Sequence, residues 1–227
     1  LCVIVSDMSA EAPCARLADH FLLADTYSVS DTLREVESFC EKYRSIDGVM
    51  CMATDVPLTV AIVAQELGLP GIPIEAAKIV SDKMLMKDCF KASYLPIPWY
   101  SEVSDAENLK QIVRDRGLPL IIKPVDSRGA RGVLKLMEDV DLDWAYLTSL
   151  SYSPSNRVMV EEFLSGPQVS TESLIVEGKV YTIGFSDRNY ELLDKYAPHI
   201  IEDGGDLPSV LLSADQQRIK DTVAQTA

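Results

Sequence analysis

Residues 118–136, LPLIIKPVDSRGARGVLKL, place two apolar runs on either side of a loop rich in glycine and arginine. The first run, 118–122, ends on Lys123 and a proline, and the second run begins at Val133. Short apolar runs bounded by glycine and proline are typical of buried strands. This stretch therefore predicts two core strands joined by a flexible loop, with a lysine at the C-terminal end of the first strand.

The composition allows a sizeable core and disfavours several classes of function. Hydrophobic residues make up 47% of the 227 residues, enough for one large domain or two smaller ones. The formal net charge of −14 argues against a nucleic-acid partner, because non-specific binding to nucleic acid needs a basic surface. The longest uncharged apolar stretch, near 56–65, is too short to span a bilayer, so we expect no membrane partner. No signal peptide is visible, and we expect a cytoplasmic protein.

Cysteine and histidine content gives little sign of a metal centre. The five cysteines form no C-x-x-C pair, and their odd number argues against a secreted disulfide framework. With only two histidines a zinc site is not expected. We name no metal ligand within this chain.

The first part of the chain alternates strand and helix patterns. Continuous apolar strands that alternate with helices are typical of a parallel α/β sheet. Strands are predicted at LCVIVS, DGVMCMA and LPGIPI, and HFLLADTY is a second short apolar segment. Helices are predicted at 30–44 and from a cap at Asp55 to Leu67, ending at Gly68. The composition shifts after about residue 78, which suggests a first domain over 1–78.

The second part is predicted to be mixed α and β. Helices are predicted at 82–92, from a Ser104-x-x-Glu107 capping box to Gly117, and at 139–150. From residue 157 the pattern becomes strand-rich, and Glu177-Gly178 predicts the turn of an antiparallel hairpin. The divisions that follow are 79–156 and 157–227.

Two lysines suggest an anion site. A Walker A loop and a G-x-G-x-x-G motif are both absent from the sequence. The glycines after Lys123 would let backbone N–H groups approach a phosphate, while the lysine adds a point charge. The alternative is a solvated hairpin turn with a lysine extended to water. Lys83, at the start of a helix, is either a second phosphate ligand or an ordinary surface lysine.

A third feature lies in VMVEEFLSGPQVSTESL, residues 158–174. Glu161 and Glu162 interrupt an apolar strand just before a Ser-Gly-Pro turn. A strand that leaves its sheet offers backbone C=O and N–H groups to a flat heterocycle such as adenine. The alternative is an amphipathic strand with one solvated face.

In this order, Asp82-Lys83, LIIKPVDSRGARGV and EEFLSGPQVSTES resemble the motifs of the ATP-grasp superfamily. Within it the chain looks most like the carbamoyl-phosphate-synthetase-like and biotin-carboxylase-like carboxylate ligases. The resemblance implies an α/β fold in three parts. These are a Rossmann-like domain over 1–78 that lacks its first strand, a small ATP-grasp subdomain with a glycine-rich lid over 79–156, and the start of a large ATP-grasp subdomain over 157–227, incomplete at the C-terminus.

The resemblance also implies roles for individual residues toward ATP. Lys83 and Lys123 would contact the phosphates. The loop 126–132 would close over them as a lid, with Ser127, Arg128, Gly129 and Gly132 as its members.

For the adenine, the resemblance makes Glu161 and the carbonyl of Glu162 acceptors for the amino group. The N–H of Leu164 would donate to the ring, and Phe163 would lie beside the base. Two further positions are also implied: Gln168 stands where many members carry a glutamate that holds the ribose, and Glu172 would help line the pocket.

The reaction implied is transfer of the ATP γ-phosphoryl group to a small carboxylate, followed by attack of an amine or related nucleophile on the acylphosphate. Magnesium would bridge the phosphates. The metal-binding carboxylates of such enzymes usually follow the hairpin, and no such segment follows Gly178 here, so we expect the chain alone to be inactive. An exposed helix face in the first domain would allow a homodimer.

Arg188 is the candidate for binding the substrate carboxylate bidentately. The alternative is a surface arginine paired with Asp187 or Glu191, and Gly204-Gly205 predicts a turn or mobile loop nearby. Two other functions stay open. One is a nucleotide-binding module that lost catalysis and serves in sensing or assembly, supported only by glutamine at position 168, and the other is a purely structural α/β protein.

Overall fold

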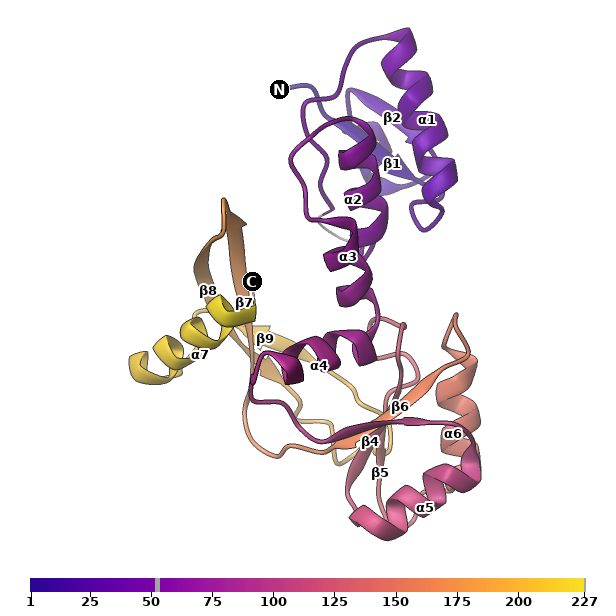
Figure 1. The fold of residues 1–227 in the computed structure, drawn as a ribbon, viewed down its shortest axis with the longest axis vertical. Coiled ribbons are helices and arrows are strands. Elements are labelled where there is room, and N and C mark those ends of the chain that lie inside the picture. The colour runs from indigo at the N-terminus through magenta and orange to yellow at the C-terminus, as the bar shows by residue number, and fades with distance from the viewer. Residues whose placement is uncertain (52–53, 227) are drawn as a thin grey trace. The chain divides into compact units, whose positions relative to one another are not determined.

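The computed structural model describes residues 1–51 and 54–226, and it divides into two compact units between Asp82 and Lys83 (Figure 1). The first unit alternates strands with helices. Its elements are β1 (Ile4–Asp7), a 3-10 helix η1 (Pro13–Arg16), β2 (His20–Leu23), α1 (Val29–Lys42), α2 (Pro57–Glu66) and α3 (Ile74–Ser81). The two strands pair in parallel, with Ile4 opposite His20, as the predicted α/β alternation requires.

Three local predictions in the first unit are wrong. Residues 47–51 of the predicted strand DGVMCMA form neither helix nor strand, because an apolar run becomes a strand only beside a ladder partner. The last two residues of that prediction, Met52 and Ala53, lie outside the described residues. The predicted strand LPGIPI is a loop leading into α3, since Pro70 and Pro73 have no backbone N–H that could donate a hydrogen bond to a neighbouring strand. Helix α2 begins at a proline, with Val56 rather than Asp55 as its cap.

The second unit contains a four-stranded antiparallel sheet with the order β3-β6-β4-β5. Figure 1 shows α5 and α6 lying against this sheet. The elements in chain order are α4 (Lys83–Ala92), β3 (Tyr100–Val103), α5 (Ala106–Arg116), β4 (Leu120–Pro124), β5 (Leu134–Leu136), α6 (Leu142–Ser151) and β6 (Val158–Glu162). Helix 82–92 and the two strands around the glycine loop are therefore confirmed.

The two faces of this sheet differ in character because side chains alternate along each strand. One face is the core, where Leu120, Ile122, Leu134, Leu136, Val158 and Val160 pack with Leu109 and Ala145. The other face carries Lys123 and Met159 in one row, and Lys135, Ile121, Glu161 and Tyr100 in the next. Polar side chains from all four strands thus share the face opposite the core.

Helix α5 begins one residue later than the capping box predicts. Its cap is Asp105, whose side chain accepts from the N–H of Asn108 at 2.8 Å, while Asn108 Oδ1 accepts from the N–H of Ser104 at 3.2 Å. Asp105 thus caps the helix in place of Ser104, while the side chain of Asn108 reaches back to the N–H of Ser104, one residue before the cap. Gly117 ends the helix at φ 78°, as predicted.

The rest of the second unit is a three-stranded sheet followed by a helix. Its elements are β7 (Gln168–Val176), β8 (Lys179–Asn189), β9 (Gly204–Asp206) and α7 (Ser213–Thr226). The turn between β7 and β8 is confirmed, with Glu177 at φ 49° and Gly178 at φ 73°, as a two-residue hairpin requires. Gly204 and Gly205 form a strand rather than a turn; a Cβ on Gly205 would meet the backbone oxygen of Asp187 at 2.9 Å, so glycine permits this close pairing.

None of the helices over the described ranges has the length and apolar character required to cross a bilayer.

Candidate functional site

Three charged side chains meet in a buried cluster on the polar face of the four-stranded sheet. Glu161 on β6 forms an ion pair with Lys123 on the neighbouring strand β4, and its Oε2 lies 2.8 Å from Nζ of Lys87 on α4. The exposed fractions of the side chains are 9% for Lys87, 12% for Glu161 and 17% for Lys123. The cluster brings together two residues that the sequence assigns to opposite ends of ATP, Lys123 to the phosphates and Glu161 to the adenine.

The cluster contains two ammonium groups and one carboxylate, so it carries excess positive charge in a protein whose net charge is −14. Burial lowers the pKa of Lys123, and the like charge of Lys87 adds to this, while attraction to Glu161 opposes it. Burial alone would raise the pKa of Glu161, but the charge and hydrogen bond of Lys123, with the contact from Lys87, lower it overall. Glu161 is therefore a carboxylate at neutral pH.

One oxygen of Glu161 still lacks a directed donor. No group within the described residues gives Oε2 a well-oriented hydrogen bond, although Lys87 Nζ lies close enough for ionic attraction. Buried polar atoms are normally satisfied. This oxygen is thus able to accept a further hydrogen bond.

Lys87 is the site residue that the sequence interpretation missed. It follows Lys83 by four positions on α4, so both side chains lie on one face of the helix. Its Nζ lies 5.4 Å from the centre of the Tyr100 ring, and the hydroxyl of Tyr100 donates to Asp88 at 2.7 Å. The i, i+4 spacing from Lys83 was the available signal.

Lys83 contacts the first residues of the glycine loop. Its backbone N–H donates to the carbonyl of Val125 at 2.9 Å, and its Nζ donates to the carbonyl of Ser127 at 2.7 Å. The start of α4 is thereby joined to the end of β4. Lys83 thus lies beside the loop that follows Lys123.

Both ends of the loop are anchored on the segment that follows α6. Asp126 accepts from the hydroxyl of Ser153 at 2.7 Å and from the N–H of Ser155 at 2.8 Å, and these bonds outweigh burial and lower its pKa. At the other end Gly132 has φ 73°, and an added Cβ would lie 3.0 Å from Tyr152. Between these anchors Gly129 and Ala130 are exposed.

The predicted adenine side of the site follows β6. The N–H of Glu162 donates to the carbonyl of Trp99 at 2.9 Å, and Leu164 is 59% exposed. The Phe163 ring lies 4.4 Å from Nζ of Lys135, a residue on the same sheet face as Glu161. Lys135 has no role in the sequence prediction.

Three predicted residues lie on the three-stranded sheet rather than on the four-stranded sheet that carries the cluster. Gln168 and Glu172 are exposed on β7. Arg188, on β8, donates through both Nε and Nη2 to the carboxylate of Glu202, with 2.8 Å from Nε to Oε1. The alternative that pairs Arg188 with Asp187 or Glu191 is therefore wrong in its partner, because β9 and the loop before it bring Glu202 beside the arginine.

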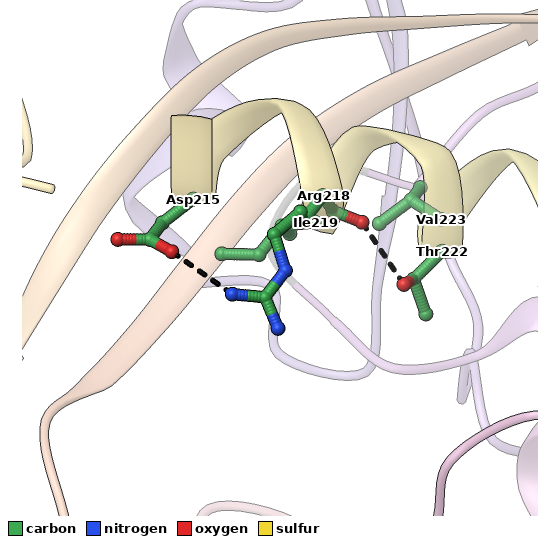
Figure 2. A pocket seen from close by; sticks show the side chains of 5 residues that line it. All are labelled: Asp215, Arg218, Ile219, Thr222 and Val223. Carbon is green, nitrogen blue, oxygen red and sulfur yellow. Dashed lines mark hydrogen bonds and ion pairs between the residues drawn. The ribbon is translucent and has the colours of Figure 1, made fainter. Parts of the chain in front are cut away.

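Figure 2 shows a pocket bordered by Asp215, Arg218, Ile219, Thr222 and Val223, all from α7. Arg218 pairs with Asp215 at 3.2 Å, and the Thr222 hydroxyl donates to the carbonyl of Arg218 at 3.0 Å. These polar groups already satisfy one another. The pocket includes no residue of the buried cluster, so we do not assign it to the nucleotide.

A search of the described residues finds no group of three or more His, Cys, Asp or Glu side chains arranged to hold a metal ion.

Comparison with known proteins gives sequence relatives and solved structures, while no family model matches the chain. Phosphoribosylamine–glycine ligase of Arabidopsis thaliana is 30% identical over 156 residues, which are 65% of this chain and 29% of that protein. D-alanine–D-alanine ligase of Desulforudis audaxviator is 30% identical over 112 residues, 48% of this chain and 36% of that protein.

Among solved structures, the ADP complex of N5-carboxyaminoimidazole ribonucleotide synthetase superposes with a TM-score of 0.78 at 16% identity, covering 100% of this chain and 56% of that one. A likeness at this identity establishes the fold. The sequence relatives are ATP-grasp ligases and the solved structures of matching fold are ATP-grasp enzymes, so the chain is similar to members of the ATP-grasp superfamily in sequence and in fold.

Proposed function

We propose that this chain holds ATP for a ligase that joins a small carboxylate to an amine through an acylphosphate. The observation that carries the proposal is the buried cluster of Lys87, Glu161 and Lys123 beside the glycine loop. Its excess positive charge suits a polyphosphate, because a desolvated cation without a full counter-ion attracts an anion strongly.

The residues present fit the nucleotide at both of its ends. Lys83 supplies an ammonium group beside the start of the loop, and Lys123 supplies another from the strand before it. The exposed backbone around Gly129 supplies N–H groups. Glu161 Oε2, which lacks a directed donor among the described residues, suits the exocyclic amino group of adenine. Phe163 and Leu164 follow directly and offer apolar surface for the base.

ATP supplies the phosphoryl group: a carboxylate oxygen bonds to the γ-phosphorus as the bond to the β–γ bridging oxygen breaks, releasing ADP. The amine nitrogen then bonds to the acyl carbon, inorganic phosphate leaves with its oxygen, and the nitrogen loses a proton. The work of this chain's residues is to position the phosphates and neutralise their charge. Among the described residues, no three His, Cys, Asp or Glu side chains are grouped so that they could hold a magnesium ion.

The relatives support a ligase over the other functions left open by the sequence. Two are named as ligases, one for phosphoribosylamine and glycine and one for D-alanine, and a structural neighbour is an ADP complex. The chain spans 29% and 36% of the two ligases, so the identity of its own acid and amine is part of the proposal. A homodimer and a cytoplasmic location stay predictions.

Release of ADP that depends on an added acid tests this function. The assay uses the protein expressed from its complete coding sequence, with glycine, D-alanine or bicarbonate as acid and hydroxylamine as nucleophile. We expect one acid to stimulate ADP release and to yield one hydroxamate per ADP, and Lys123→Met to lower the rate by about 100-fold or more, because a charge-stabilising donor is lost.

Lys179→Met, on the β7–β8 hairpin, is the matched control and should leave the rate unchanged. ATP binding without ADP release for any acid would contradict the ligase and favour the alternative, a nucleotide-binding module with a sensing or assembly role.

A further inference from the structure

The buried cluster contains one more lysine than a simple ion pair requires. Lys123 contacts one oxygen of Glu161 and Lys87 contacts the other. The side chains of all three are at least four-fifths buried, so each charge depends on its neighbours rather than on water. The role of the second lysine is the question.

The two lysines differ in how freely they can leave the carboxylate. Lys87 extends from α4 over the ring of Tyr100, 5.4 Å from its centre, and Tyr100 is in turn bonded to Asp88 on the same helix. Lys123 lies near the end of β4, where the chain enters the glycine loop, and it is the more exposed of the two. Lys87 is thus fixed, and Lys123 lies at the edge of the site.

A phosphate that draws Lys123 away would leave Glu161 buried without its first counter-ion. Breaking a buried ion pair by removing one partner is strongly unfavourable, because the remaining charge is neither hydrated nor compensated. Lys87 removes this difficulty, since its ammonium group already lies 2.8 Å from the second carboxylate oxygen. The repulsion between the ammonium groups of Lys87 and Lys123, which both contact Glu161, also favours the departure of Lys123.

We propose that Lys87 is a positioning residue that keeps Glu161 neutralised, so that Lys123 is released to the phosphates of the nucleotide. Lys87 itself does not touch the phosphates. This inference rests on the proposed function, because it requires an ATP that recruits Lys123. It assigns a role to a residue that neither the motifs nor the predicted ligand set includes.

The test is the Lys87→Met variant of the full chain, measured in two ways. Without ligand the remaining Lys123–Glu161 pair is balanced, so we expect the midpoint of thermal unfolding to stay unchanged or to rise. With ligand, Lys123 must serve Glu161 and the phosphates at once, so we expect the Kd for ATP to rise roughly 10- to 100-fold. Isothermal titration with ATP and with adenosine measures the second effect, and adenosine binding should change less than 3-fold, since it does not recruit Lys123.

Two further variants make the result specific. Lys87→Arg keeps the charge and should restore most of the ATP affinity, whereas Lys91→Met, at an exposed position of the same helix, should change nothing. A Lys87→Met variant that binds ATP like the wild type would overturn the inference. So would one that loses ATP and adenosine affinity equally together with its thermal stability, which is the signature of a purely structural lysine. If the wild type itself does not bind ATP, the proposed function fails first.

Discussion

Replacing Glu161 with alanine is expected to lower the free energy of unfolding by about 3–5 kcal/mol at pH 7, because two buried ammonium groups then lose their counter-ion. Urea denaturation followed by circular dichroism measures this loss. Glu162→Ala is the matched control, because Glu162 is the next residue of the strand and is exposed. We expect it to change the free energy of unfolding by no more than about 0.5 kcal/mol.

A second mutation diagnoses the cause of the loss. Adding Lys87→Met to Glu161→Ala removes one of the two uncompensated charges, so the double variant should be more stable than Glu161→Ala alone. If Glu161→Ala is as mild as Glu162→Ala, the cluster is not the buried charge centre described above.

Gly132→Ala is expected to cost about 2–4 kcal/mol of stability, the sum of left-handed backbone strain and a steric clash. Gly132 has φ 73°, and a Cβ there would lie 2.9 Å from Pro124 and 3.0 Å from Tyr152. Gly129→Ala separates the two terms, since Gly129 has φ 61° with nothing within 4 Å of the added atom. We expect about 1 kcal/mol at Gly129, from backbone strain alone.

Thermal and urea unfolding of the two glycine variants measures this difference. Equal losses at both positions would show that the packing of Gly132 on Tyr152 does not hold the exit of the loop. The expected result instead makes Gly132 an anchor and Gly129 part of the exposed section of the loop.

Local patterns in the sequence were sufficient for much of the second unit. The strands on either side of the glycine loop follow from continuous apolar runs, and the β7–β8 turn follows from Glu177-Gly178, because few residues accept two successive positive φ angles. Where the pattern was an apolar run without a partner, as at 47–51, the predicted strand does not form. Strand formation depends on a ladder that a single segment does not reveal.

The predicted site residues stay a prediction, and their pairing with one another does not follow from the sequence. The motifs named Lys123 and Glu161 as ligands at opposite ends of ATP, and only the antiparallel register of β4 and β6 places them in contact. No motif singles out Lys87, and only the structure shows its contact with Glu161. Arg188 pairs with Glu202, which lies 14 residues further along the chain, so the pair cannot be predicted from sequence neighbours alone.

The most direct test of the account is isothermal titration of the purified chain with ATP, on the wild type and on Lys123→Met. We expect saturable binding of one nucleotide with a Kd below about 1 mM, and a Kd at least about 10-fold higher for Lys123→Met, since a charge-assisted contact to phosphate is lost. Absence of saturable binding in the millimolar range, or equal affinity of the two proteins, would contradict it.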